Sequence, residues 1–469
     1  MKRVLTLLVA AFVISAIHAE SGKTSTSELS QVSNDGTSSA IFSPYLDLQV
    51  DNFHHDDEFA TRRGMPNFMA KCMAGEEVKI GYIGGSITYA NYMWRKQSAY
   101  YIASMFPEAI ISGINAARGG TGSDIGACRM DEHMMQYKPD MVFIEFAVNA
   151  ANEHGVEGII RKIIMEDPTI DICLVYTIYR GQAQNYADGE IPFNVARLEK
   201  VAKYYNLPSI HMGMQAGFLE RDGKLLWEGT AAEAGRKILF SHDGVHPATA
   251  GGDLYASAVA RCFEAMKSNV GESKMELPPP LSPRQMDRAK YLEPSLFGLE
   301  DWKKSPVTAD NENKNCILWF ENIYSADAQS SPLKFKFKGD YLAILDTASP
   351  DSGDIDIYVD GKKWIVTEYN RGRYGTGNGV AKSDFFDADD PRCSVNRFFS
   401  QSTEVRDRDI ISFTLEEGIH EIEVRVHDEP INKAERLKMS DEEFDKVKEK
   451  YEGQRFNLGK VLINGDIIK

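Results

Sequence analysis

The chain has 469 residues, more than one domain usually contains, so two or three domains are expected. Hydrophobic residues make up 43% and charged residues 26% of the sequence, a composition typical of globular proteins and not of disordered ones. The formal net charge of −16 argues against a nucleic-acid backbone or an anionic membrane as the main partner, because both bind basic surfaces.

The N-terminus has the layout of a secretory signal peptide over residues 1–19. A basic start precedes the apolar run Val4–Ile14, and small residues follow up to Ala19. We therefore expect a secreted or periplasmic protein whose mature chain begins near Glu20. Residues 20–43 are rich in Ser, Thr and Gly and predict a flexible leader. No later segment is long and apolar enough to predict insertion into a membrane.

Neither a metal site nor a disulfide framework is indicated by the spacing of His, acidic and Cys residues. Asp51–Glu58 holds two adjacent histidines among acidic residues, but no ligand spacing stands out, so we predict a solvated turn. Six cysteines in a chain of this length do not form a disulfide scaffold, and no spacing identifies a pair. Cys128, Cys173 and Cys262 lie in apolar periodic segments and are predicted to be buried free thiols.

Residues 44–268 alternate short apolar runs with segments of helical spacing. The predicted strands are Val78–Ile83, Ala109–Ile114, Met141–Val148, Asp171–Ile178 and Ser209–Met212. The predicted helices are Met93–Met105, Ser123–Gln136, Gly155–Met165, Phe193–Tyr205 and Thr249–Met266. Such alternation predicts an α/β domain in three layers, with a parallel sheet covered by helices on both faces. Residues 213–240 fit the alternation poorly and are interpreted as an insertion near the site.

A different periodicity follows a proline-rich linker predicted over residues 269–296. Apolar and charged residues alternate in Leu333–Lys338 and in later segments, and Asp360-Gly361 is a hairpin signal. We predict an antiparallel β-sandwich, jelly-roll-like accessory domain over residues 297–469. The charged segment Ala434–Tyr451 is predicted to be a solvated helical insertion.

The first predicted strand, Val78–Ile83, ends abruptly at Gly84-Gly85-Ser86. Two glycines allow a sharp turn that would leave the Ser86 hydroxyl exposed at the sheet edge, where parallel sheets bind their ligands. This is a position suited to a nucleophile. The alternative is that Ser86 is only the N-cap of the following helix.

The segment Ser241–Pro247 precedes the last predicted helix and contains Asp243 three positions before His246. One turn can bring the carboxylate to one imidazole nitrogen and leave the other facing Ser86, as a general base for a serine nucleophile requires. Alone, the segment could also be a metal site of His242, Asp243 and His246, or an ordinary loop.

Together, these blocks resemble the SGNH hydrolases, also called GDSL-like esterases. Two further blocks fall in the family's order, Asn115–Ser123 as its glycine block and Phe146–Asn149 as its asparagine block. The resemblance implies that Ser86, Asp243 and His246 are catalytic residues. It also implies an oxyanion hole made by the Ser86 N–H, the Gly120 N–H and the Asn149 amide.

Three positions in these blocks depart from the family pattern. Ala147 stands before the Val-Asn step where the family often has Gly, Ala150 follows the Asn where it often has Asp, and Gly85 replaces the usual Asp before the serine. We expect the oxyanion hole to be intact and only its support to differ.

The resemblance implies a flavodoxin-like fold and an esterase that needs no metal and no cofactor. Export, an appended sandwich and a likeness to carbohydrate-active members favour removal of O-acetyl groups from a polysaccharide or oligosaccharide. Tyr89, Tyr92 and Trp94 could stack on a sugar, although packing of the first helix explains them equally well. The alternatives are a lipase-like or aryl esterase, a site adapted to another bond such as a glycosidic one, and a carbohydrate-binding scaffold with a degenerate hydrolase domain.

Overall fold

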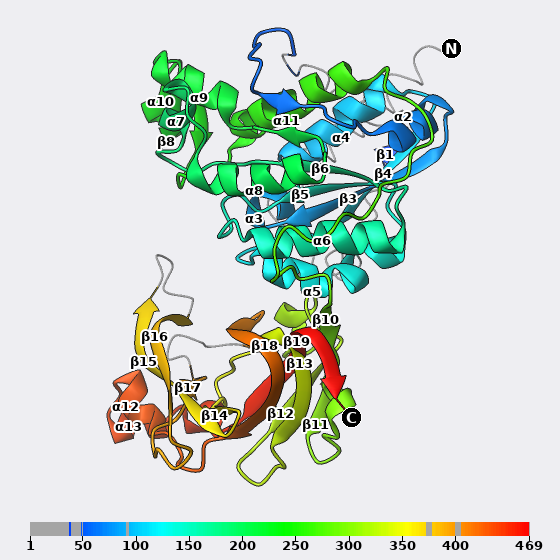
Figure 1. Ribbon diagram of the computed structural model, residues 1–469. Coiled ribbons are helices and arrows are strands. Elements are labelled where there is room, and N and C mark those ends of the chain that lie inside the picture. Colours follow the sequence, from blue (N-terminus) through cyan, green and yellow to red (C-terminus); the bar gives the residue numbers. More distant parts are fainter. Residues whose placement is uncertain are drawn as a thin grey trace, which may run out of the picture.

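The computed structural model describes residues 37–38, 48, 50–90, 93–371, 378–398 and 405–468. The chain forms an N-terminal α/β unit followed by a C-terminal β unit (Figure 1). The predicted signal peptide lies outside the described residues, as does the predicted leader apart from Thr37–Ser38. In the described part of the chain, no helix has both the length and the apolarity needed to cross a bilayer.

A seven-stranded sheet forms the centre of the N-terminal unit, in the order β1-β4-β3-β5-β6-β7-β2. Its strands are β1 (Thr37–Ser38), β2 (Phe59–Ala60), β3 (Glu77–Gly84), β4 (Ile110–Asn115), β5 (Met141–Glu145), β6 (Asp171–Val175) and β7 (Ser209–Ile210). The five strands from β4 to β7 pair in parallel, whereas the short strands β1 and β2 join the edges antiparallel. All five predicted strands are present, although β5, β6 and β7 end two or three residues earlier than predicted, and their order is that of flavodoxin-like sheets.

Helices cover both faces of this sheet, so the predicted three layers are confirmed. They are α2 (Pro66–Met73), α3 (Ser86–Tyr89), α4 (Trp94–Met105), α5 (Ser123–His133), α6 (Glu153–Glu166), α7 (Ala183–Ala187), α8 (Phe193–Tyr204) and α11 (Thr249–Met266). Figure 1 shows α4 and α11 together on one face and α5 with α6 on the other, and these pairs contact one another. The helix predicted to reach Gln136 ends at His133, where the 3₁₀ turn η4 (Met135–Tyr137) follows.

Residues 213–240 form the predicted insertion, a small subdomain of two helices and two strands. Its elements are α9 (Met214–Arg221), β8 (Leu225–Glu228), α10 (Ala231–Ala234) and β9 (Ile238–Ser241). Strands β8 and β9 pair in parallel and form a separate two-stranded sheet. The rings of Trp227 and Phe240 stack with their centroids 4.0 Å apart, which gives the insertion a core of its own.

The predicted linker is partly a strap and partly a strand. The backbone N–H groups of Leu281 and Ser282 donate to the carboxylate of Glu157, which ties the segment to α6. Further on, β10 (Ala289–Leu292) pairs with the last strand of the chain, β19 (Phe456–Ile468). The β unit therefore begins within the range 269–296 and not at residue 297, because β10 is already part of its sheet.

The C-terminal unit is built on ten antiparallel strands that belong to one hydrogen-bonded sheet. Besides β10 and β19, these are β11 (Lys303–Pro306), β12 (Asn322–Ala326), β13 (Leu333–Asp346), β14 (Asp354–Val359), β15 (Lys362–Arg371), β16 (Asn378–Phe386), β17 (Val395–Asn396) and β18 (Asp409–Val426). The 3₁₀ turn η5 (Pro294–Phe297) lies between β10 and β11, and the 3₁₀ turn η6 (Lys314–Cys316) lies between β11 and β12. The prediction of antiparallel strands is confirmed, but the strands form one continuous sheet, whereas a sandwich in its simplest form has two. Asp360 and Gly361, with φ of +53° and +76°, form the predicted two-residue hairpin turn.

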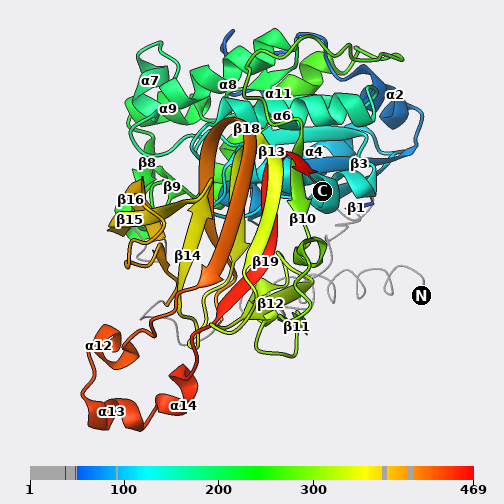
Figure 2. The same cartoon turned by 60° about the horizontal axis from the view of Figure 1, so that its bottom comes forward.

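The predicted helical insertion at 434–451 is three short helices and not one. They are α12 (Lys433–Leu437), α13 (Asp441–Asp445) and α14 (Lys448–Tyr451), and Figure 2 shows them at the end of the sheet remote from the N-terminal unit. The ammonium group of Lys433 is buried and donates to three backbone carbonyls, those of Pro350, Tyr451 and Gly453. Lys433 stands just before the predicted segment. Within the segment, the prediction of a solvated surface is wrong at its two ends, because Ala434 and Tyr451 are buried.

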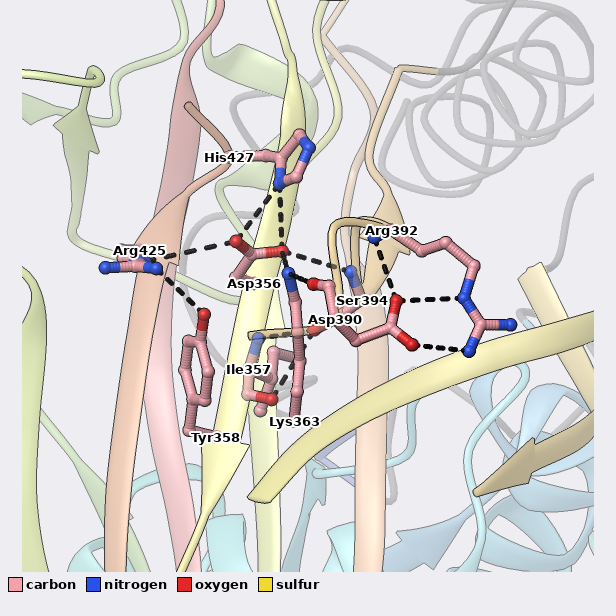
Figure 3. Close-up of polar contacts among 9 residues, drawn as sticks. All are labelled: Asp356, Ile357, Tyr358, Lys363, Asp390, Arg392, Ser394, Arg425 and His427. Atoms are coloured by element: carbon pink, nitrogen blue, oxygen red, sulfur yellow. Dashed lines mark hydrogen bonds and ion pairs between the residues drawn. The ribbon is translucent and has the colours of Figure 1, made fainter. Parts of the chain in front are cut away.

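A buried polar cluster on β14 ties three neighbouring strands of the C-terminal unit together (Figure 3). Asp356 is 3% exposed and pairs with Lys363 of β15 at 2.9 Å and with His427 beyond β18 at 3.0 Å. Because a buried carboxylate is stable only when its oxygens are paired, the cluster fixes the register of these strands.

The two units meet at α5, where their hydrophobic cores are continuous. The Tyr341 hydroxyl donates to Asp124 at 3.0 Å, and the Lys460 ammonium lies 3.2 Å from Glu132. Trp319 of the C-terminal unit is 4% exposed and belongs to the same core cluster as the strands of the parallel sheet.

The side chains considered for disulfides and metals are placed as predicted. Cys128, Cys173 and Cys262 are buried free thiols, and burial raises the pKa of each. His54 and Asp56 of the acidic cluster are exposed to 90% and 96%, as in a solvated turn.

Candidate active site

Ser86 stands at the carboxyl end of β3, between β4 and β5, where the strand order of the sheet reverses. A β-carbon on Gly84 would lie 2.6 Å from the Glu145 carbonyl oxygen, so the close approach of β3 and β5 requires glycine there. Ser86 is the first residue of α3, and the N-cap is Gly85. The alternative N-cap role of the serine is therefore not what the structure shows.

His246 bridges Ser86 and Asp243. Its Nε2 lies 2.7 Å from Ser86 Oγ, and its Nδ1 lies 2.7 Å from Asp243 Oδ2. The other carboxylate oxygen of Asp243 accepts from the backbone N–H groups of Val245 and His246 at 3.0 and 2.8 Å. One carboxylate thus folds the turn and orients the imidazole, an arrangement in which the histidine can accept the serine proton.

Burial raises the pKa of the Asp243 carboxyl, but hydrogen bonds from the His246 side chain and from two backbone N–H groups outweigh it. The net result is a pKa well below the usual range, so the carboxylate is ionised and can stabilise an imidazolium. His242 points elsewhere, with Nδ1 3.0 Å from the Gly229 carbonyl. The alternative metal site of His242, Asp243 and His246 is not assembled, and no group of metal-binding side chains occurs among the described residues.

The insertion supports the loop that carries His246. The Gly244 carbonyl accepts from the indole N–H of Trp227 at 3.1 Å and from the backbone N–H of Arg180 at 2.8 Å. Gly244 has a φ of +81°, a conformation that glycine adopts without strain. The turn that carries Asp243 and His246 is therefore held by a residue of β8, a contact that the sequence did not predict.

The glycine and asparagine blocks both lie against Ser86 and the residue before it. A β-carbon on Gly119 would lie 3.6 Å from Ser86 Cβ, which puts the glycine block beside the nucleophile. A β-carbon on Gly85 would overlap Asn149 Oδ1 and lie 2.7 Å from its Nδ2. The space that the family's usual Asp would need is thus filled by the Asn149 side chain.

The chain after Asn149 has a strained backbone. Ala150 and Ala151 have φ of +64° and +44°, values that residues with a β-carbon rarely adopt. Asn149 Oδ1 is buried and makes no hydrogen bond to any described residue. Strained residues and unpaired polar atoms persist where the surroundings enforce them and cluster at functional sites, so both observations point to this loop.

Glu145, which the sequence reasoning missed, lies beneath the site at the end of β5. It is fully buried and accepts from the hydroxyls of Thr88 and Thr177 at 2.8 and 2.5 Å. Burial raises the pKa of Glu145. These two hydrogen bonds and one from the Gly85 backbone N–H lower it, but burial has the larger effect. The signal was present, because Glu145 is the one charged residue within the apolar run predicted for this strand.

The predicted sugar-binding aromatic residues have different outcomes. Trp94 is fully buried, and its ring packs on those of Tyr82 and Phe143, so its prediction as a sugar-stacking residue is wrong. It lies on the inner face of α4, which sequence spacing alone did not determine. Tyr89 is half-buried near Arg118, and burial raises its pKa. Tyr92 lies outside the described residues.

Two exposed aromatic rings that the sequence reasoning did not single out lie in the segments that follow β6. Tyr179 is 44% and Phe193 79% exposed. The residue after Phe193, Asn194, donates to the Ala147 carbonyl at 2.7 Å, which ties the start of α8 to the asparagine block. Exposed rings at the carboxyl edge of the sheet are suited to stack on a ligand.

Solved structures share the fold of this chain. A two-domain esterase active on acetylated mannans, co-crystallized with mannopentaose, matches with a TM-score of 0.58 and 19% identity over 86% of this chain and 94% of its own. A second structure of a two-domain esterase active on acetylated mannans matches with a TM-score of 0.57 and 19% identity over 85% of this chain and 94% of its own. Axe2, an acetylxylan esterase from Geobacillus stearothermophilus, matches with a TM-score of 0.30 and 20% identity over 42% of this chain and 97% of its own.

The first two matches extend over both units, so the chain has the two-domain fold of that esterase. The resemblance inferred from the four sequence blocks is thereby confirmed as a likeness of fold. No protein-family model and no curated protein matches the chain.

Proposed function

We propose that this protein is an exported serine esterase that removes O-acetyl or other small acyl groups from a polysaccharide or oligosaccharide. The observation that carries the proposal is the continuous relay from Ser86 through His246 to Asp243, with both contacts at 2.7 Å. Such a relay activates a serine hydroxyl for attack on an ester carbonyl.

In the proposed reaction, His246 takes the proton of Ser86 Oγ as the oxygen attacks the ester carbon. The negative oxygen that forms is held by the Ser86 N–H, the Gly120 N–H and the Asn149 amide. His246 then gives its proton to the departing sugar oxygen, which leaves as a hydroxyl, and an acyl-enzyme remains on Ser86. Water, deprotonated by His246, attacks this ester, and His246 returns the proton to Ser86 Oγ as the acid is released. The ionised carboxylate of Asp243 orients and stabilises the imidazolium in both steps.

Three observations support a carbohydrate substrate. The solved structures that share the fold over both units include an esterase active on acetylated mannans. Tyr179 and Phe193, in the segments that follow β6, are exposed aromatic residues, and rings of this kind stack on sugars. The insertion at 213–240 has the charged stretch Glu220–Lys224, which is unlike the apolar lid of a lipase.

The test is acetate release from p-nitrophenyl acetate and from a panel of acetylated glycans that begins with acetylated mannan. We expect wild-type protein to release acetate from at least one glycan, and Ser86→Ala to lose activity by roughly 10⁶-fold while remaining folded. Release that does not depend on Ser86 would refute the serine mechanism. If folded wild type releases no acetate, two assays separate the alternatives. Cleavage of a glycosidic bond would indicate an adapted site, whereas glycan binding to Ser86→Ala without any cleavage by wild type would indicate a binding scaffold.

A further inference from the structure

An arginine of the C-terminal unit reaches into the glycine block of the N-terminal unit. Arg408 stands immediately before β18, and its Nη2 donates to the Gly119 carbonyl at 2.5 Å. The two residues are 289 positions apart in the sequence. Since a β-carbon on Gly119 would lie 3.6 Å from Ser86 Cβ, this contact is made beside the nucleophile.

A second arginine makes the reciprocal contact from the other side. Arg118, which directly precedes Gly119, donates from Nε to the Leu318 carbonyl of the C-terminal unit at 3.1 Å. The centroid of the Trp319 indole ring lies 5.0 Å from the Arg408 guanidinium and 6.0 Å from that of Arg118, so both cations contact the same ring. The glycine block is thus part of the joint between the two units.

The geometry of the peptide bond gives this contact a consequence for the oxyanion hole. The Gly119 carbonyl and the Gly120 N–H belong to one planar trans peptide, in which they point in opposite directions. A guanidinium that holds the carbonyl therefore also fixes the direction of the N–H. Its charge polarises the peptide and strengthens the N–H as a donor. Gly120 has a φ of +69° and no side chain, so no side chain of its own helps to fix this peptide.

We propose that Arg408 is a positioning residue for the esterase reaction, which holds the Gly119–Gly120 peptide so that the Gly120 N–H faces the developing oxyanion. The inference rests on the proposed function and extends it, because it makes the C-terminal unit part of the catalytic apparatus. The Arg408 side chain is 20% exposed and pairs through Nη1 with Asp407, so its guanidinium is held in place and partly desolvated. A charge-assisted hydrogen bond in such surroundings is stronger than one in water.

The first test compares wild type, Arg408→Met and Arg408→Lys with the control Glu132→Gln, which weakens the contact to Lys460 elsewhere in the joint. Removing an oxyanion donor costs about 10²–10³-fold in kcat, so a donor that is only misdirected should cost about 10–100-fold. We expect kcat on p-nitrophenyl acetate to fall by that factor in Arg408→Met with little change in KM, and by less in Arg408→Lys. The control should keep wild-type kcat. Equal losses in Arg408→Met and in the control would overturn the proposal.

The second test uses a fluorophosphonate probe, which labels an activated serine without any knowledge of the natural acyl group. We expect the second-order rate of Ser86 labelling to fall in Arg408→Met in parallel with kcat/KM. Equal labelling rates for wild type and Arg408→Met would overturn this inference and leave the proposed function standing. A folded wild type that is not labelled would overturn both.

Chemical rescue separates positioning from a structural role. In Arg408→Ala, added guanidinium ion at millimolar concentration can occupy the vacated space beside the Gly119 carbonyl. We expect it to restore part of the lost kcat in this variant and none in Ser86→Ala. Thermal unfolding of each variant checks that the fold is kept. A variant that unfolds at the wild-type temperature, has lost activity and gains none from guanidinium would contradict the assignment.

Discussion

Substitution of Gly85 by alanine should disable the oxyanion hole without any change to a catalytic residue. The backbone at Gly85, with φ of −92° and ψ of −152°, is extended and accepts a β-carbon. The added methyl group would nevertheless lie 2.5 Å from Asn149 Cγ and 2.7 Å from Nδ2, closer than such atoms approach in proteins. The Asn149 amide must therefore move, by about 1 Å if ordinary contacts are to be restored.

The magnitude follows from what that movement removes. Loss of one oxyanion donor costs about 2.7–4 kcal/mol of transition-state stabilisation, and a misplacement of about 1 Å in a catalytic site can cost 10²-fold in rate. We expect Gly85→Ala to lower kcat by about 10²–10³-fold, as Asn149→Ala should. Crowding should also lower the free energy of unfolding of Gly85→Ala by about 1–3 kcal/mol.

A double-mutant cycle of Gly85→Ala and Asn149→Ala tests whether the alanine acts only by displacing the Asn149 amide. If the alanine acts only by displacing the amide, Gly85→Ala adds no further loss of kcat once Asn149 is already alanine. The double variant should also regain the free energy of unfolding lost in Gly85→Ala, because the clash has gone. The assays are hydrolysis of p-nitrophenyl acetate and urea unfolding of all four proteins. Additive losses of kcat, or full activity in Asn149→Ala, would refute the assignment of Asn149 to the oxyanion hole.

Three further predictions concern the supports of the site and the core. Asp243→Asn keeps one acceptor for the turn but faces His246 with an amide, so kcat should fall by roughly 10⁴-fold with unfolding unchanged within about 1 kcal/mol. Trp227→Phe removes the donor to the Gly244 carbonyl, and we expect a loss of about 1 kcal/mol in urea unfolding together with a lower kcat. Burial lowers the pKa of His211 from 6.5 to about 4. Between these values only the unfolded chain binds the proton, so the free energy of unfolding should fall by about 3 kcal/mol as pH drops through this window. Urea unfolding at pH 7.5 and 4 should show that loss in wild type and lack it in His211→Gln.

The strands and the edge that carries the site could be predicted because they depend on local patterns. The run Val78–Ile83 is apolar throughout and ends at two glycines, which is sufficient to predict a buried strand and a sharp turn. Parallel strands place their carboxyl ends at one edge, so residues as distant in sequence as Ser86 and His246 could be expected together. Their 2.7 Å contact follows from that topology.

The predictions that failed, and the residues that were missed, depend on the direction in which a side chain points and on partners that are distant in sequence. Trp94 begins a helix in which either face could carry an aromatic residue, and only the packing against Phe143 shows that it faces inward. Glu145 looked like an exception in an apolar run, although its two threonine partners come from separate segments of the chain. Ala434 and Tyr451 bound the charged segment that was predicted to be solvated, yet both are buried. No periodicity encodes any of these contacts.

The contacts across the joint between the two units could not be predicted from sequence patterns either, and they bear on function. Both arginines that cross the joint bind main-chain carbonyls, an interaction that leaves no mark on the partner's sequence. The alternating residues of the C-terminal unit predicted its strands but neither of these contacts. With Arg408 on the Gly119 carbonyl, any movement of the C-terminal unit relative to α5 would also turn the peptide that carries the Gly120 N–H. If that N–H is an oxyanion donor, as proposed, the interface on the glycine block restrains the oxyanion hole together with the two units.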